Sequence, residues 1–531
     1  MLMQPRVDIL DSTLRDGAQA EGISFSVEDK LKIVEALDDL GVAYIEAGNP
    51  GSNPKDLEFF NRLRTVTLKN AKLVAFGSTR RRDTVTEEDN NIIALLNADS
   101  PAVSIFGKCW DFHATQILQT SLEENLRMIA DTISFFKSKG KEVIFDAEHF
   151  FDGYKNNAAY ALQALQTASE AGADCLALCD TNGGCFPSEI YEIVKVVTAQ
   201  IDAKIGIHTH NDSGLAVANS IMAVEAGATH IQGTYTGFGE RCGNANLSTL
   251  IPNLQLKRDM RCIPAEQVIN LTYTARKISE IANLNLYKRD PYVGNSAFAH
   301  KGGMHIDGVC KAASSFEHID PTLVGNKRRF LMSEVAGRKT LVEKIREIDP
   351  NIDKNSPEAE QIIERLKEME HQGYQFEGAE STFELIVRKQ LGKYKPFFEL
   401  EKFQLMTEQP KLSGPSASAL IKVTVDGKSE ITAAEGDGPV HALDRALRKA
   451  LEVFYPELSQ VHLTDFKVRV IDSNRATAAK VRVLIESTDG ESVWTTVGVS
   501  TDIIEASWIA LVDSIEYKLL KELEKKIKVY L

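Results

Sequence analysis

The sequence predicts a (β/α)8 TIM barrel, then a helical lid and connector region, and finally a C-terminal α+β domain. Three observations support this fold. Short apolar runs alternate with amphipathic helical patterns eight times in about 250 residues, the size of such a barrel. Polar residues gather where the apolar runs end, and from about residue 413 the pattern changes to alternating strands followed by helices. We expect the barrel in residues 1–285, the lid and connector in 286–405, and the last domain in 406–531.

Each of the eight expected strands is a short apolar run bounded by polar or glycine-containing segments. They are Val7–Leu10, Ala43–Ala47, Leu73–Gly77, Ala102–Phe106, Glu142–Ala147, Cys175–Cys179, Lys204–Ile207 and His230–Gly233. A doubly wound open sheet is the alternative, but it has fewer strands and usually a glycine-rich turn after the first one. Here that turn reads DSTLRDGAQ, which is no dinucleotide fingerprint, so the barrel is favoured.

The bulk composition restricts partners and compartment. A net charge of −14 argues against nucleic acid or an anionic membrane surface as a partner. No apolar run reaches the roughly 18–20 residues of a membrane span, and the N-terminus has no secretory signal pattern, so we expect a cytoplasmic protein. The seven cysteines include no CxxC pair and are interpreted as free thiols in a reducing compartment.

Polar residues collect at the carboxyl ends of the expected strands, where (β/α)8 barrels carry out their chemistry. In chain order they are Arg15, Asp16, Glu46, Arg80, Arg81, Arg82, Asp146, Glu148, Thr181, His208, His210 and Asn244. Scattered surface charge would not favour one end of every strand. The sequence therefore predicts a catalytic site at this end of the barrel.

His208 and His210 are candidate metal ligands. Residues at i and i+2 of a strand point to the same face, so both imidazoles can reach one ion. With Asp16 and Asn244 they would form a mixed nitrogen and oxygen set that suits Mg²⁺, Mn²⁺, Fe²⁺ or Co²⁺. Other interpretations stay open: the histidines could bond to backbone or solvent, Asp16 could be a turn residue before Gly17, and Asn244 could cap a helix.

Four stretches together resemble one enzyme family: DSTLRDGAQ, HTHNDSGLAVANS, GFGERCGNANL and NSAFAHKGGMHIDGV. They are similar to motifs of the metal-dependent acyl-CoA Claisen-condensing enzymes, which are the isopropylmalate, homocitrate and citramalate synthases and relatives of hydroxymethylglutaryl-CoA lyase. The stretches LRDGAQAEGISFSVEDKL, IEAGNPGSNPKD and SIFGKCWDFH resemble the citramalate branch. Ala18 departs from the isopropylmalate pattern, which typically has Glu there.

The resemblance implies an acyltransferase that condenses acetyl-CoA with pyruvate and hydrolyses the thioester to (R)-citramalate and CoA, on the route to isoleucine. The alternative acceptor is 2-oxoisovalerate, which would give 2-isopropylmalate. A divalent ion (Mn²⁺, Mg²⁺, Co²⁺ or Zn²⁺) would be held by Asp16, His208, His210 and Asn244. The remaining expected site residues are Arg15 and Thr181 for the substrate carboxylate, Glu46 to orient the site, Glu148 as base, and His305 in a lid that reaches the barrel of a partner subunit.

The C-terminal region reads as two units of alternating strands followed by a helix, the first with Asp426-Gly427 as its hairpin turn. We expect these ββα units to pack as one sheet against helices. By resemblance this domain binds the end product isoleucine as feedback effector and supports a homodimer. A purely structural dimerisation domain is the alternative.

Several alternatives remain at this point. The same metal site could serve a lyase or aldolase, or the chain could be a non-enzymatic metabolite sensor. The arginines at 80–82 could contact CoA phosphates or form a solvated charge run. Four aromatic residues near the ends of strands 4 and 5 could narrow the pocket to fit a methyl group or could be core: Phe106, Trp110, Phe112 and Phe145.

Overall fold

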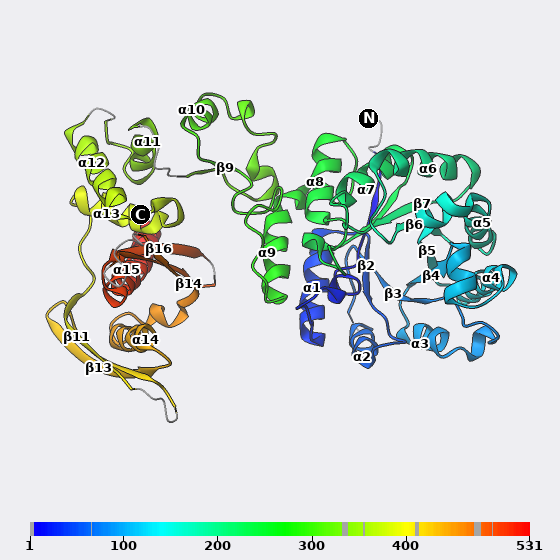
Figure 1. Ribbon diagram of the computed structural model, residues 1–531, viewed down its shortest axis with the longest axis horizontal. Helices are drawn as coiled ribbons and strands as arrows, with labels where there is room; N and C mark the ends of the chain where they lie inside the picture. Colours follow the sequence, from blue (N-terminus) through cyan, green and yellow to red (C-terminus); the bar gives the residue numbers. More distant parts are fainter. Residues whose placement is uncertain are drawn as a thin grey trace. The chain divides into compact units, whose positions relative to one another are not determined.

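The computed structural model describes residues 5–64, 66–331, 338–353, 356–408, 414–471, 479–490 and 492–530. The chain divides into two compact units (Figure 1). One consists of Met1–Ala299 with Glu317–Arg329, and the other of His300–Phe316 with Phe330–Leu531. The domain boundaries expected at 285 and 405 stay predictions.

The first unit is a closed barrel of eight parallel strands in sequence order, β1 to β8 (Figure 1). The strands are β1 (Asp8–Asp11), β2 (Tyr44–Gly48), β3 (Lys72–Ser78), β4 (Ala102–Lys108), β5 (Glu142–Glu148), β6 (Cys175–Asp180), β7 (Ile205–Thr209) and β8 (His230–Gly233). The helices of this unit are α1 (Val27–Leu40), α2 (Pro54–Leu63), α3 (Asn90–Ala98), α4 (Leu122–Ser138), α5 (Phe150–Glu170), α6 (Pro187–Gln200), α7 (Ala216–Glu225), α8 (Leu247–Lys257) and α9 (Leu271–Ile281). The predicted TIM barrel is confirmed, and every expected strand lies within a residue or two of its observed bounds.

Local sequence signals set the helix bounds. Helix α1 begins at a capping box, in which the Ser26 side chain accepts from the Asp29 backbone and the Asp29 side chain accepts from the Ser26 backbone. It ends at Gly41, whose φ of 88° is strained for a residue with a side chain. The chain then turns directly into β2, which brings Glu46 to the barrel interior.

Side chains along each strand alternate between the core under the helices and the interior of the barrel. Outward residues such as Ile9, Ile45 and Val103 join the large core between the sheet and its helices. Inward residues at the amino ends of the strands form a small apolar plug: Leu10, Tyr44, Val74, Ala102, Ile144, Cys175 and Ala177. Polar inward residues follow at the carboxyl ends, so the candidate site rests on a filled barrel.

Phe145 belongs to the outer core and does not line a pocket. It is fully buried among the residues between the sheet and the helices. Its ring lies so close to Gly107 that a Cβ there would come within 2.7 Å of it, with Ile129 on the same side. The possibility that Phe145 narrows the substrate pocket is therefore wrong, and the core alternative holds for this residue.

The second unit is helical first and mixed afterwards. The chain passes between the two units at β9 (Ala299–His300) and β10 (Arg329–Phe330), and α10 (Gly303–Lys311) lies in the second unit. The helices α11 (Arg338–Ile348), α12 (Pro357–Gln372) and α13 (Glu380–Gln390) share one apolar core, as expected of a helical connector. Among the described residues, no helix is both long and apolar enough to span a bilayer.

The C-terminal region contains two antiparallel three-stranded sheets, each followed by a helix. The first is β11 (Glu399–Thr407), β12 (Ala417–Val425) and β13 (Lys428–Gly436) with α14 (Pro439–Leu451); the second is β14 (His462–Val470), β15 (Val481–Thr488) and β16 (Val493–Ser500) with α15 (Ile503–Tyr530). The duplication and the Asp426-Gly427 turn are as expected. The expectation of two-stranded units in a single sheet is wrong, because each repeat has three strands and forms its own sheet.

Candidate active site

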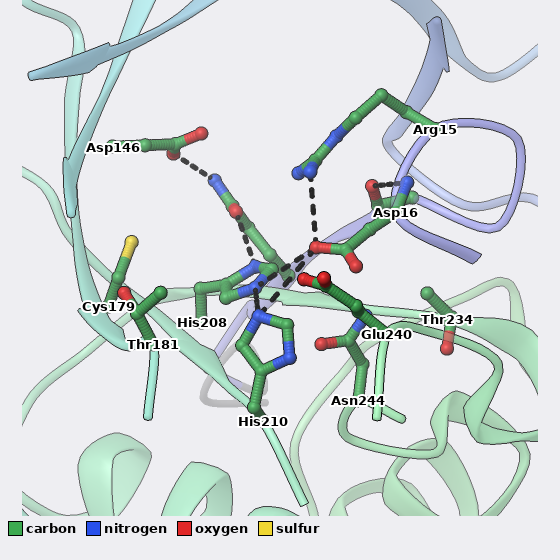
Figure 2. Close-up of polar contacts among 12 residues, drawn as sticks. Arg15, Asp16, Asp146, Cys179, Thr181, His208, His210, Thr234, Glu240 and Asn244 are labelled. Carbon is green, nitrogen blue, oxygen red and sulfur yellow. Dashed lines mark hydrogen bonds and ion pairs between the residues drawn. The ribbon is translucent and has the colours of Figure 1, made fainter. Parts of the chain in front are cut away.

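Asp16, His208 and His210 meet at the carboxyl end of the barrel (Figure 2). The Nε2 atoms of the two imidazoles are 3.3 Å apart, and Asp16 Oδ2 lies 3.4 Å from the first and 3.9 Å from the second. Two ligand atoms that share one ion at about 2.1 Å are separated by roughly 3–3.5 Å, so this spacing fits a common cation. All three side chains are buried.

The protonation states suit cation binding. Burial alone would raise the pKa of Asp16, but Arg15 and the two histidines hold it at about 2. Burial lowers the pKa of His208, and burial together with His208 lowers that of His210 to about 4. At neutral pH the group is therefore one carboxylate and two neutral imidazoles, each with a lone pair to share.

Asn244 completes the set from the segment after β8. Its side chain lies beside Asp16 and contributes to the lowered pKa of that carboxyl. The amide nitrogen donates to the Phe238 carbonyl at 3.3 Å, while Oδ1 is buried without a hydrogen bond among the described residues. The alternative role as helix cap is wrong, since Asn246 caps α8. An orphaned buried oxygen next to a carboxylate and two imidazoles fits a fourth ligand to a divalent ion.

Arg15 and Glu46 form a buried ion pair next to this group. Arg15 Nε lies 2.6 Å from Glu46 Oε2, and Arg15 Nη1 lies 3.1 Å from Asp16 Oδ2. Burial opposes the charge, but Glu46 and Asp16 raise the pKa of Arg15 above its ordinary value, so the guanidinium stays cationic. It lies 3.8 Å above the ring of Phe76, which stacks in turn on Phe106.

Glu148 and Thr181 stand at the ends of β5 and β6. Lys108 forms an ion pair with Glu148 and orients its carboxylate. The backbone N–H of His149 donates to the Thr181 hydroxyl oxygen at 2.9 Å. His149 itself has a φ of 54°, a conformation that residues with side chains seldom adopt, and its Nδ1 lies 3.2 Å from Asp152. Its place after Glu148 at the end of a strand is the one sequence signal for this strained residue.

Three inward-facing residues carry hydrogen bonds of the site that sequence reasoning did not assign. Gln232 lies between His208 and Asp146, and Ser104 donates to Asp146. The sequence places Asp146 at a strand end without indicating a role, and it does not single out Gln232 or Ser104. The available signal was alternation, because each of them has the same inward parity as the polar residues at the end of its strand.

Two other expected residues have surroundings of their own. His305 is on α10 in the second unit, exposed, with its ring stacked on Phe316 at 4.4 Å between centroids. Its acid–base role stays a prediction. Arg80 is neither solvated nor free for phosphates, because it is 6% exposed and pairs with Glu124 and Asp131.

Three family profiles match successive parts of the chain. The HMGL-like profile matches residues 6–284, and the homocitrate synthase post-HMGL domain-like profile matches residues 292–374. The LeuA allosteric (dimerisation) domain profile matches residues 377–519. The first covers the whole barrel, and the last covers both C-terminal sheets.

Full-length relatives agree with these matches. The (R)-citramalate synthase of Aquifex aeolicus is 54% identical over 99% of this chain and 100% of the relative. The (R)-citramalate synthase of Geobacter sulfurreducens is 51% identical over 98% of each. A probable 2-isopropylmalate synthase of Methanopyrus kandleri is 33% identical over 96% of this chain and 98% of the relative. The resemblance found in the motifs is confirmed over nearly the full length.

Proposed function

Since this chain belongs to the HMGL-like family, in its (R)-citramalate synthase branch, we propose that it condenses acetyl-CoA with pyruvate and releases (R)-citramalate and CoA. The observation that carries the proposal is the buried group of one carboxylate and two imidazoles beside a buried guanidinium. The guanidinium can pair with the carboxylate of a 2-oxo acid, and the carboxylate and imidazoles would hold a divalent ion that polarises its keto group.

The residues that would hold a divalent ion, Mn²⁺, Mg²⁺, Co²⁺ or Zn²⁺, are Asp16, His208, His210 and Asn244. When bound, the ion supplies Lewis-acid polarisation of the keto group and stabilises negative charge on its oxygen. This chain's own residues do the rest. Chelator-sensitive activity is the direct expectation.

Arg15 and Thr181 are proposed to hold the substrate carboxylate. The guanidinium is fixed by Glu46 and Asp16 and stays charged, so it can pair with an anion without reorganising. The Thr181 hydroxyl oxygen already accepts from the His149 backbone. Its own proton is therefore available to donate to a carboxylate.

Glu148 is proposed as the base that removes a proton from the acetyl methyl group. It ends β5, faces the barrel interior by alternation, and is oriented by Lys108. The carbanion so formed attacks the keto carbon of pyruvate, and water then cleaves the thioester to release CoA. His305, exposed on α10, is proposed to serve acid–base work near the thioester.

The C-terminal domain is proposed to bind isoleucine and to join two chains as a homodimer. The support is the match to the LeuA allosteric (dimerisation) domain, together with the similarity to citramalate synthases. We also propose a cytoplasmic location. The seven cysteines form no disulfide and five of them are buried, as suits a reducing compartment.

The test is release of free CoA from acetyl-CoA, measured over a panel of 2-oxo acids with and without EDTA and isoleucine. We expect the highest kcat/KM with pyruvate, loss of activity in EDTA, and recovery on adding Mn²⁺. A higher kcat/KM with 2-oxoisovalerate would instead assign 2-isopropylmalate synthesis. Full activity after complete metal removal would refute the metal-dependent mechanism.

A further inference from the structure

A row of buried hydrogen bonds crosses the inside of the barrel beneath the candidate metal site. Ser104 Oγ on β4 donates to Asp146 Oδ2 on β5 at 2.8 Å. Gln232 Nε2 on β8 donates to Asp146 Oδ1 at 2.6 Å, and Gln232 Oε1 lies 3.0 Å from His208 Nδ1 on β7. Figure 2 shows the chain of dashed contacts that links Asp146 to His208. The four side chains are between 0% and 5% exposed, so water does not compete for these bonds.

The direction of these bonds fixes where the proton of His208 lies. Ser104 and Gln232 each donate to one oxygen of Asp146, so the amide nitrogen of Gln232 faces Asp146 and the amide oxygen faces His208. That oxygen can only accept a hydrogen bond, so Nδ1 of the imidazole must carry the proton. The lone pair is then on Nε2, the atom that faces Asp16 and His210.

We infer that Gln232, oriented by Asp146, is a positioning residue that holds His208 in its Nδ1–H tautomer and so sets the affinity of the site for a divalent cation. The inference rests on the metal site of the proposed function. Groups that hydrogen-bond to a ligating histidine in this way are worth about 10- to 100-fold in metal affinity. Within the described chain His210 has no such support, because its Nδ1 is buried without a hydrogen bond.

The first experiment measures Mn²⁺ binding by isothermal titration calorimetry on the full-length, metal-free chain. Gln232→Leu has nearly the same bulk and removes both hydrogen bonds, so we expect Mn²⁺ to bind about 10- to 100-fold more weakly. Cys179→Ala is the matched control. Cys179 is paired with His208 across β6 and β7 and has the same inward parity, but it makes no hydrogen bond to it. Its loss should change the affinity by less than about threefold, since no partner of His208 is removed.

Two further variants separate hydrogen bonding from packing. Asp146→Asn can keep an oxygen that accepts from Gln232 and an amide that donates to Ser104, but it removes one negative charge, so it should keep the Nδ1–H tautomer of His208 while any loss of Mn²⁺ affinity reports charge alone. Gln232→Asn stays polar but is one methylene too short to bridge Asp146 and His208, so it should weaken binding as Gln232→Leu does. If Gln232→Leu does not fold, which circular dichroism would show, Gln232→Asn still decides the question.

A second readout is the tautomer itself. Nitrogen-15 shifts of selectively labelled histidine in the metal-free protein distinguish Nδ1–H from Nε2–H, and His208→Gln identifies the signal. We expect Nδ1–H in the parent and a mixture in Gln232→Asn. Asp16→Ala tests the metal site separately from the positioning role of Gln232. Unchanged Mn²⁺ binding in that variant would refute the metal site. Abolished binding in Asp16→Ala with parental affinity and tautomer in both Gln232 variants would refute the positioning role alone.

Discussion

Replacing Arg15 by lysine keeps the positive charge but removes the planar fork of the guanidinium. The fork now does three things at once: Nε contacts Glu46 at 2.6 Å, Nη1 contacts Asp16 at 3.1 Å, and the plane lies 3.8 Å above Phe76. A lysine ammonium is a point charge on a flexible stem and cannot meet both carboxylates while presenting an edge to a substrate. The substitution therefore tests geometry separately from charge.

The expected loss follows from one charge-assisted hydrogen bond to the substrate carboxylate. Such a bond contributes about 1.5–3 kcal/mol, and each 1.4 kcal/mol is about tenfold in rate. We therefore expect kcat/KM for pyruvate to fall about 10- to 150-fold. Because the bond is to the substrate carboxylate, which changes little on reaction, most of the loss should be in KM for pyruvate and little in KM for acetyl-CoA.

The assay is CoA release under varied pyruvate at saturating acetyl-CoA, with the thermal midpoint measured in parallel. Arg80→Lys is the matched control, since Arg80 is also buried and paired with two carboxylates but lies outside the site. It should lower the thermal midpoint and leave KM for pyruvate unchanged. If Arg15→Lys retained the parental kcat/KM for pyruvate, the assignment of Arg15 to the substrate carboxylate would be wrong.

Three further predictions concern the choice of acceptor, a buried carboxyl group and the effector. Phe106→Ala removes the ring that stacks on Phe76 beside Arg15 and so enlarges the space for the acceptor side chain. The ratio of kcat/KM for 2-oxoisovalerate to kcat/KM for pyruvate should then rise by about 10- to 200-fold. An unchanged ratio would exclude Phe106 from acceptor selection. Burial raises the pKa of Asp11 to about 7, so the folded chain binds more protons than the unfolded chain between about pH 4 and 7 and loses stability as pH rises through that window. The free energy of unfolding of Asp11→Asn should then exceed that of the parent by up to about 4 kcal/mol at pH 8 and by little at pH 4. The difference in thermal midpoint should therefore grow with pH, and a pH-independent difference would contradict burial of the charge as the cause. Isoleucine should inhibit CoA release by the full-length chain while leucine at the same concentration has little effect, and the reverse order would overturn the effector proposal.

The barrel could be predicted closely because alternation of short apolar strands and amphipathic helices is a local signal. The strands of the barrel are short, largely buried runs, and the first four crossover helices begin at a capping side chain: Ser26, Asn53, Asp89 and Ser121. The C-terminal sheets were harder. The strand missing from the predicted first repeat is β11, whose burial alternates only weakly. Residues 399–407 therefore resemble the charged connector that precedes them.

The candidate metal ligands were easier to predict than the residues whose hydrogen bonds position them. His208, His210 and Asp16 stand out because two imidazoles share one face of a strand and all three residues follow strand ends of one barrel. Gln232 and Ser104 carry no such signal, since an isolated amide or hydroxyl in a strand is common, and their role depends on which strands become neighbours. Phe145 shows the opposite error: an aromatic residue near a strand end suggested a pocket, but its parity places it on the outer face of the barrel.

The charges around Arg15 link binding of the cation to binding of the substrate. Asp16, Glu46 and Asp146 bring three carboxyl groups into one buried layer, and Arg15 contacts two of them. Burial, and then the negative charge of the nearby Glu46, raise the pKa of Asp146 to about 7. Three ionised carboxyl groups beside one guanidinium would leave an excess of negative charge in this layer. A divalent cation next to Asp16 would relieve this excess, and a 2-oxo acid would then bring its own carboxylate to a layer no longer too negative to accept it. On this argument cation and substrate should bind in order, with pyruvate affinity low in the metal-free chain, and equal pyruvate binding with and without Mn²⁺ would refute it.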